Sequence, residues 1–434
     1  MQPHQSSLSH SNARDLDDLA RMLRDNGLLR EDETLPCVGE DAIARREQAI
    51  SFSIEEGTVT ALSLRFCNLE ALPASFANLG GLRLLDLAGN RLETLPVPTE
   101  GFPQLRKVYL DNNRLSTLPE TPEAFPQFIE LHADANHLTT LPAGLSRLTN
   151  LEVLRLYGNQ LSALPEEIGE LTQLSDLSVG HNQLDALPAS LWKLTRLHTL
   201  NLAENRLSSL SPEIASLREL RMLDLAHNQL TSLPPLANDF SKLQVLYLSN
   251  NHFTTLPQAF FERLPRLTYL NLTDNQLTAL PESIGTLAHL RELRIYNNQL
   301  ASLPTSLEEM SELRELHAMN NQLTTLPASL GTLRRLQELH LMGNRLTTLP
   351  ASLGQLTALR HLDLRNNHLS ALPPSLGQLT SLTTLDLRAN RLTSLPPWIG
   401  ELPSLEKLDL RWNKLGEVPG WLEEMGERGC VVYL

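Results

Sequence analysis

The chain has 434 residues, of which 41% are hydrophobic and 20% are charged, and its formal net charge is −14. An acidic body is not attracted to nucleic acid or to an anionic membrane surface, so neither is an expected partner. Its three cysteines are too few and too scattered for a disulfide framework, and no segment approaches the ~20 apolar residues that a membrane helix needs. The composition predicts a cytoplasmic protein, or one exported without an apolar signal sequence.

The N-terminal region is expected to contain a leader and a helix. Residues 1–13 are rich in Ser, His and Gln and have almost nothing to bury, so we expect them to be disordered. A polar leader of this kind resembles the export signals of bacterial injection systems. A helix is then predicted from Asp15 to Gly27, with one apolar face formed by Leu16, Leu19 and Leu23.

Residues 14–56 are predicted to form an N-terminal helical cap. A second helix is expected over Glu40–Ile50, followed by a turn at residues 55–57 and a first strand from Val59. A cap is needed because the exposed edge of a stack of strands otherwise invites aggregation.

From residue 57 to residue 413 the chain repeats one pattern, seen most clearly in NRLTTLPASLGQLTALRHLDLRNN (Asn344–Asn367). Its frame is L-x-x-L-x-L-x-x-N, and the spacing between repeats is 23 residues except for one step of 24. The ninth position can be followed through sixteen repeats: Cys67, Asn90, Asn113, Asn136, Asn159, Asn182, Asn205, Asn228, Asn251, Asn275, Asn298, Asn321, Asn344, Asn367, Asn390 and Asn413. This regularity predicts an elongated solenoid whose units contact only their neighbours.

The frame resembles the leucine-rich repeat. The LPxxLGxL segment between successive frames is similar to that of the 23-residue Ras-suppressor-like class of these repeats, which is also found in bacterial proteins. The resemblance implies an α/β solenoid, a leucine-rich-repeat horseshoe with a parallel concave sheet of about 16 short strands, an N-terminal helical cap and a C-terminal cap. Residues 414–434 are assigned to the C-terminal cap, with a last strand at Cys430–Leu434. The family implies binding of proteins through the concave face, without catalysis.

Each residue type of the repeat has a predicted role. The leucines of the frame face the core, and the ninth-position Asn turns inward to bond backbone groups of the turns on either side. Leu349-Pro350 begins the convex segment and Gly354 is expected to end it. Prolines at 98, 103, 122 and 126 predict irregular convex segments in two early repeats.

The third, fifth and seventh positions of each strand remain free to face a partner. Five of the six tyrosines stand there, and Tyr247, Tyr269 and Arg294 gather on neighbouring strands. Because Tyr, Arg and Met are enriched in interface cores, we predict a partner-binding concave patch. It consists of Tyr247, Tyr269, Glu292, Arg294, Tyr296, Glu315, His317, Met319, Glu338, His340, Met342 and His361.

Two Glu-x-His pairs inside this patch leave alternatives open. Glu315 with His317 and Glu338 with His340 repeat the same pair on adjacent strands, which makes a metal site and a metal-dependent hydrolytic enzyme conceivable. Hydrogen bonding between neutral Glu and His pairs is the expected explanation, with no metal and no cofactor. No nucleotide-binding, serine-hydrolase, zinc-protease or kinase motif is present.

A second patch is predicted in the early repeats at Lys107, Tyr109, Asp134, Arg155 and Tyr157, with Asp111, Glu130 and His132 beside them. It is either a second contact surface or solvated polar surface. Near the C-terminus, Asp363, Asp386 and Asp409 stand beside Arg365, Arg388 and Arg411 and are expected to neutralise one another.

The sequence therefore predicts a non-catalytic, monomeric scaffold that binds one protein partner of unknown identity through the concave sheet face. The alternative is a bacterial effector that an injection system delivers into the host cytosol, where it acts by binding a host protein.

Overall fold

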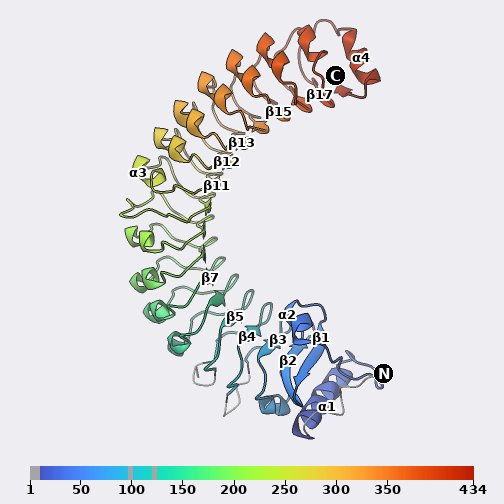
Figure 1. Ribbon diagram of the computed structural model, residues 1–434, viewed down its shortest axis with the longest axis vertical. Helices are drawn as coiled ribbons and strands as arrows, with labels where there is room; N and C mark the ends of the chain where they lie inside the picture. The colour runs from blue at the N-terminus through green and yellow to red at the C-terminus, as the bar shows by residue number, and fades with distance from the viewer. Residues whose placement is uncertain (1–9, 96–100, 120–124) are drawn as a thin grey trace. The chain divides into compact units, whose positions relative to one another are not determined.

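The computed structural model describes residues 10–95, 101–119 and 125–434. The chain folds as two compact units, Met1–Arg206 and Leu207–Leu434. In each unit the strands line one face and the helical turns line the opposite face (Figure 1). We call the strand side of each unit its concave face.

The first unit contains an N-terminal cap and a stack of repeats. Its helices and strands are α1 (His10–Asp25), α2 (Glu40–Ala44), β1 (Ile50–Glu55), β2 (Thr58–Leu64), β3 (Leu84–Asp86), β4 (Lys107–Tyr109), β5 (Glu130–His132), β6 (Val153–Arg155), β7 (Asp176–Ser178) and β8 (Thr199–Asn201). Short 3-10 helices form the convex turns η2 (Ala74–Asn78), η4 (Ala143–Arg147), η5 (Glu166–Glu170) and η6 (Ala189–Lys193). From β2 onward, each strand pairs in parallel with the next.

The second unit continues the same pattern. Its strands are β9 (Met222–Asp224), β10 (Val245–Tyr247), β11 (Tyr269–Asn271), β12 (Glu292–Arg294), β13 (Glu315–His317), β14 (Glu338–His340), β15 (His361–Asp363), β16 (Thr384–Asp386), β17 (Lys407–Asp409) and β18 (Val431–Tyr433). The convex turns are η7 (Pro212–Ser216), α3 (Gln258–Phe261), η8 (Glu282–Thr286), η9 (Thr305–Glu309), η10 (Ala328–Thr332), η11 (Ala351–Gln355), η12 (Pro374–Gln378) and η13 (Pro397–Ile399), and α4 (Trp421–Glu427) follows them.

The predicted solenoid of short parallel strands is confirmed. Within the described residues, β2–β17 supply one strand for each of the sixteen repeats. The frame leucines form the core, as shown by Leu336, Leu339 and Leu341, which are all 0% exposed. At the C-terminal end β18 pairs in parallel with β17, so the last strand lies where the sequence predicts it.

The N-terminal cap differs from the prediction at both helices. α1 begins at His10, so the described residues 10–13 are helical rather than part of a leader, and residues 1–9 lie outside the described part of the chain. α2 ends at Ala44, and the second half of the expected helix is replaced by a loop and the start of β1.

A β-hairpin explains the shorter second helix. β1 pairs antiparallel with β2, opposite to every other pairing described, and buries Phe52, which is 1% exposed. The connecting residues Glu56 and Gly57 have φ values of 49° and 80°, the left-handed conformation that a tight hairpin turn requires. Alternating Ser and large apolar residues in β1 favour this strand, most of which lies outside the predicted helix and turn.

The convex turns correct one predicted role for glycine. Pro350 precedes η11 as expected, but Gly354 lies inside the turn and does not end it. A Cβ atom on Gly354 would stand 2.9 Å from the Cβ of Ser375 in the next repeat, and one on Gly331 would stand 2.7 Å from the Cβ of Ser352. Glycine therefore permits close packing between neighbouring turns. Of the prolines expected to disrupt two early turns, those at 98 and 122 lie outside the described residues.

The ninth-position asparagines form the predicted ladder. Asn321 is 6% exposed, and its Nδ2 donates to Ile295 O of the preceding repeat at 2.9 Å and to Met319 O of its own turn at 3.1 Å. Its Oδ1 accepts the Leu300 N–H at 3.0 Å. One amide thus holds two successive turns in a fixed relation. No helix in the described part of the chain combines the length and apolar composition needed to cross a membrane.

We expect Asn321→Ala to lower the free energy of unfolding by ~1–3 kcal/mol, because it leaves buried backbone groups without partners. The measurement is urea denaturation followed by circular dichroism. Thr324→Ala, at an exposed position of the same repeat, is the control and should change the stability by less than ~0.5 kcal/mol. Equal stability of the two variants would contradict the role assigned to the ladder.

Candidate functional site

The predicted concave patch is assembled by the regular register of the second unit. Strands β10 to β15 pair in parallel, so equivalent positions of successive repeats stand directly opposite each other. Position three gives the column Tyr269, Glu292, Glu315, Glu338 and His361, and position five gives Tyr247, Asn271, Arg294, His317 and His340. The structure therefore brings these predicted residues together on one face.

An aromatic cluster occupies one end of the patch. The rings of Tyr247 and Tyr269 lie 5.0 Å apart between centroids, and the guanidinium of Arg294 lies 5.8 Å from the Tyr269 ring. Arg294 also forms an ion pair with Glu292 on its own strand. Burial raises the pKa of Tyr269 to about 12, so its hydroxyl stays protonated and can donate a hydrogen bond at neutral pH.

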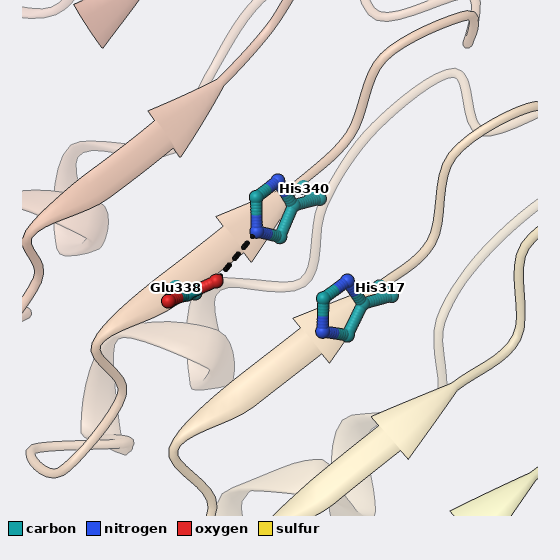
Figure 2. A group of neighbouring side chains, drawn as sticks. All are labelled: His317, Glu338 and His340. Carbon is teal, nitrogen blue, oxygen red and sulfur yellow. Dashed lines mark hydrogen bonds and ion pairs between the residues drawn. The ribbon is translucent and has the colours of Figure 1, made fainter. Parts of the chain in front are cut away.

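The two Glu-x-His pairs lie in the middle of the patch, between Arg294 and His361 in the register. Figure 2 shows His317 beside the second pair, Glu338 and His340. His317 Nε2 is 3.1 Å from Glu315 Oε2, and His340 Nε2 is 2.9 Å from Glu338 Oε2, so the predicted hydrogen bonds are present. The two imidazoles are nearly parallel, with 8° between their planes and 4.7 Å between their centroids.

The surroundings shift the pKa of one group in each pair. Burial lowers the pKa of the His317 imidazole, and the hydrogen bond from His340 lowers the pKa of the Glu338 carboxyl. At neutral pH this arrangement favours a neutral His317 and an ionised Glu338. Among the residues that the structure describes, two groups could offer ligands to a cation: His317 with Glu338 and His340, and Glu292 with Glu315 and His317. The ligand atoms of each group lie within 4.8 Å of one another.

The other predicted members of the patch complete its surface. Tyr296, Met319 and Met342 are half-buried at position seven, next to the histidine columns. His361 stands opposite Glu338 in the register of β14 and β15. A hollow begins there and is lined by Glu338, His340, His361, Leu362, Asp363, Arg365, Thr384 and Asp386.

Several of these lining residues were missed as candidates. Asp363 and Arg365 were interpreted only as mutually neutralising, and they do form that pair, with Arg365 Nη2 2.7 Å from Asp363 Oδ2. Asn271 was also missed, although it stands between Tyr247 and Arg294 in the register. The signal that identifies Asn271, Asp363 and Arg365 is their place in the repeat, because each occupies position five or seven.

The second predicted patch lies in the first unit and is held together by internal contacts. Lys107 Nζ is 2.6 Å from Glu130 Oε1, and Arg155 Nη2 is 2.7 Å from Asp176 Oδ2. Tyr157 donates its hydroxyl to Glu204 at 2.6 Å. These ion pairs and hydrogen bonds match the alternative of a polar surface whose charges are satisfied within the chain.

Tyr109 departs from the prediction that it is available to a partner. It is 9% exposed, because the guanidinium of Arg46 from the N-terminal cap lies 4.3 Å above its ring. Arg46 also pairs with Asp86 and Asp111, with nearest N–O distances of 3.3 Å and 2.9 Å. Tyr109 therefore packs under the cap instead of facing a partner.

Asp134 has a strongly perturbed pKa, as does Tyr109, whose pKa burial raises to about 12. Burial raises the pKa of Asp134 to about 6, and its Oδ1 accepts the Tyr157 N–H at 2.6 Å. Because this pKa lies above the value of 3.8 for an unperturbed Asp, the folded protein holds the proton more tightly than the unfolded chain. The contribution of Asp134 to stability therefore falls as the pH rises through this interval.

We expect Asp134→Asn to raise the free energy of unfolding relative to wild type at about pH 7 and to leave it nearly unchanged at about pH 4. The variant keeps an oxygen acceptor for Tyr157 and removes the charge. Urea denaturation at the two pH values measures the difference. Asp185→Asn, at an exposed position, is the control and should show no such dependence on pH. A difference for Asp134→Asn that does not change with pH would contradict the assignment.

Comparison with known proteins identifies the repeat. A family model described as "Leucine rich repeat" matches residues 58–115, 195–237, 241–300, 288–346, 311–369 and 357–415. Two further leucine-rich-repeat models match residues 218–262 and 150–171. No curated protein matches the chain significantly.

Solved structures show the same fold. A leucine-rich-repeat protein of Leptospira interrogans is 35% identical, with a TM-score of 0.81 over 92% of this chain and 99% of that chain. An internalin of Listeria monocytogenes is 26% identical (TM-score 0.63; 72% of this chain and 88% of that chain). YopM of Yersinia enterocolitica is 26% identical (TM-score 0.56; 93% and 92%). With family matches over more than half of its residues, the chain belongs to the leucine-rich repeat family.

Proposed function

We propose that this protein is a non-catalytic scaffold that binds a protein partner through the concave patch of its second unit. The leucine-rich repeat fold is a protein-interaction scaffold and is typically non-enzymatic. The observation that carries the proposal is the cluster of Tyr247, Tyr269 and Arg294 on three adjacent strands.

The chemistry of this cluster suits the centre of an interface. Tyr247, Tyr269 and Arg294 are half-buried, so their side chains are already ordered while part of each remains accessible. Ordering before binding reduces the entropy that association costs. Tyr and Arg are also the residue types that dominate interface energetics.

The charge around the cluster indicates a complementary partner surface. Glu292, Glu315 and Glu338 stand in one column across β12, β13 and β14, whereas Arg294 supplies a single cation beside them. A partner with aromatic or apolar side chains at its centre and basic groups nearby would complement this face.

We expect Tyr247→Ala, Tyr269→Ala and Arg294→Ala each to weaken capture of the partner by about fivefold or more, equivalent to ~1 kcal/mol. The measurement is a pull-down from the native organism, first with wild type against the triple variant and then by titration with the identified partner. The three side chains lie on the sheet face, so their removal should leave the fold intact.

Arg263→Ala is a matched control for Arg294→Ala. Arg263 lies on the convex side of the same unit and pairs with Asp239, with 2.9 Å between Nη1 and Oδ1. It should bind the partner as wild type does. Normal capture by the triple variant, with folding verified by circular dichroism, would rule out the patch as the binding site.

The alternative is a bacterial effector that is delivered into host cells and acts there by binding a host protein. Solved structures similar to this chain come from the bacteria Leptospira interrogans, Listeria monocytogenes and Yersinia enterocolitica. The polar composition of residues 1–9, which precede α1, supports the same idea. In the main proposal the protein stays in the cytoplasm of its own cell.

A secretion assay separates the two. If the chain is an effector, residues 1–50 fused to a reporter enzyme should carry the reporter into host cells through a bacterial injection system. The control is the same reporter fused to residues 51–100, which should remain in the bacterium. Retention of both fusions would exclude delivery by the N-terminal segment and leave the cytoplasmic scaffold.

A further inference from the structure

We propose that the concave face of the second unit binds one divalent transition-metal ion of the zinc class through His317, Glu338 and His340. The ion would be held by the two imidazole Nε2 atoms and one carboxylate oxygen. This site is independent of the proposed protein partner, because it requires only side chains of this chain.

The backbone places the three ligands in fixed relation. His317 on β13 stands directly opposite His340 on β14, and Glu338 precedes His340 by two residues, so it projects on the same side of the strand. Figure 2 shows the two imidazoles side by side with the Glu338 carboxylate next to His340. One ligand atom from each residue lies within 4.8 Å of the others.

Small side-chain rotations would complete the geometry. Zinc bonds of ~2.0–2.1 Å in a tetrahedron place ligand atoms ~3.4 Å apart. Ligand atoms up to 4.8 Å apart must therefore approach by at most about 1.4 Å. The side chains have room for this, since those of His317, Glu338 and His340 are 14%, 35% and 24% exposed. The strands themselves need not move.

The donor types also suit a cation. Imidazole and carboxylate together are the donors that zinc and cobalt accept, and imidazole must be neutral to bind. Binding would replace the hydrogen bonds that the two Nε2 atoms now make with Glu315 and Glu338.

The neighbouring charges favour one ion and not two. Glu315 continues the acidic column beside Glu338 and lowers the electrostatic energy of a cation there, whereas Glu292 is already paired with Arg294. The group of potential ligands that contains Glu292 and Glu315 also uses His317. Because one Nε2 atom binds one ion, the two groups compete, and the expected stoichiometry is one ion per chain.

A third Glu-Leu-His triplet provides an internal control. Residues 130–132 have the same local sequence as 315–317 and 338–340, on strand β5 of the first unit. The register places Tyr109 and Arg155 on the two sides of His132, so neither neighbouring strand supplies the second imidazole that the proposed site has. His132 should therefore not bind the ion.

The test uses the full chain, freed of any histidine tag and treated with a chelator, and titrates it with Zn²⁺ by calorimetry and with Co²⁺ by visible absorption. Wild type should bind one Zn²⁺ per chain. His317→Gln, Glu338→Gln and His340→Gln should each raise the Kd at least about tenfold, whereas His132→Gln should leave it unchanged. Binding of less than one ion by wild type would overturn the proposal, as would a Kd unaffected by His317→Gln and His340→Gln.

A measurement on wild type keeps the test valid if a variant does not fold. Nuclear magnetic resonance should show that one equivalent of Co²⁺ broadens the imidazole signals of His317 and His340 and leaves that of His132 sharp. Broadening of His132 instead, or of none of the three, would overturn the site. No partner protein enters either experiment, so a negative result here leaves the scaffold proposal untouched.

Discussion

The buried amide of the ninth-position Asn is the interaction on which the rest of the structure depends. It bonds backbone groups of its own turn and of the turn before it, as Asn321 does with Met319, Ile295 and Leu300. A solenoid of three-residue strands has few strand hydrogen bonds per repeat, and the turns between them would otherwise bury unpaired polar groups. The ladder satisfies those groups and sets the spacing of the stack.

Regular stacking makes the concave face a surface of aligned columns. Since neighbouring strands pair in parallel without a shift, a side chain at position five always faces position five of the next repeat, as His317 faces His340. The frame leucines fill the core, and the frame asparagines bond the turns. The residue types at positions three, five and seven of each strand can therefore vary without disturbing the fold. Residues 23 apart in the sequence then lie next to each other on the concave face.

The repeat and its face were predictable from sequence because every unit restates the same local requirements. The columns containing Tyr247, Glu292 and His317 follow from the period and the alternation of a strand alone. Features that occur only once are harder to predict. The β1 hairpin has no second copy to define its pattern, and the sequence predicts no strand before Val59.

The same reason explains why the burial of Tyr109 does not follow from the repeat pattern. Its position in the frame is that of an exposed residue, and it is covered by Arg46, which reaches it from a cap outside the repeat.

The role of Gly354 shows a further limit of reading one repeat at a time. Within its own turn it resembles a helix terminator, and only the Ser375 of the next turn explains why a side chain is excluded there.

The three Glu-Leu-His triplets show that neighbouring repeats also determine the chemical environment of a side chain. The three triplets form the same three-residue strand with the same burial pattern, so we expect differences in function to come from the repeats on either side. His132 lies between Tyr109 and Arg155, whereas His317 and His340 lie next to each other, beside the column that contains Glu315 and Glu338. In a solenoid of this kind, a site is formed by residues of two adjacent strands. A motif within one repeat therefore does not by itself determine which ligands or partners the site can bind.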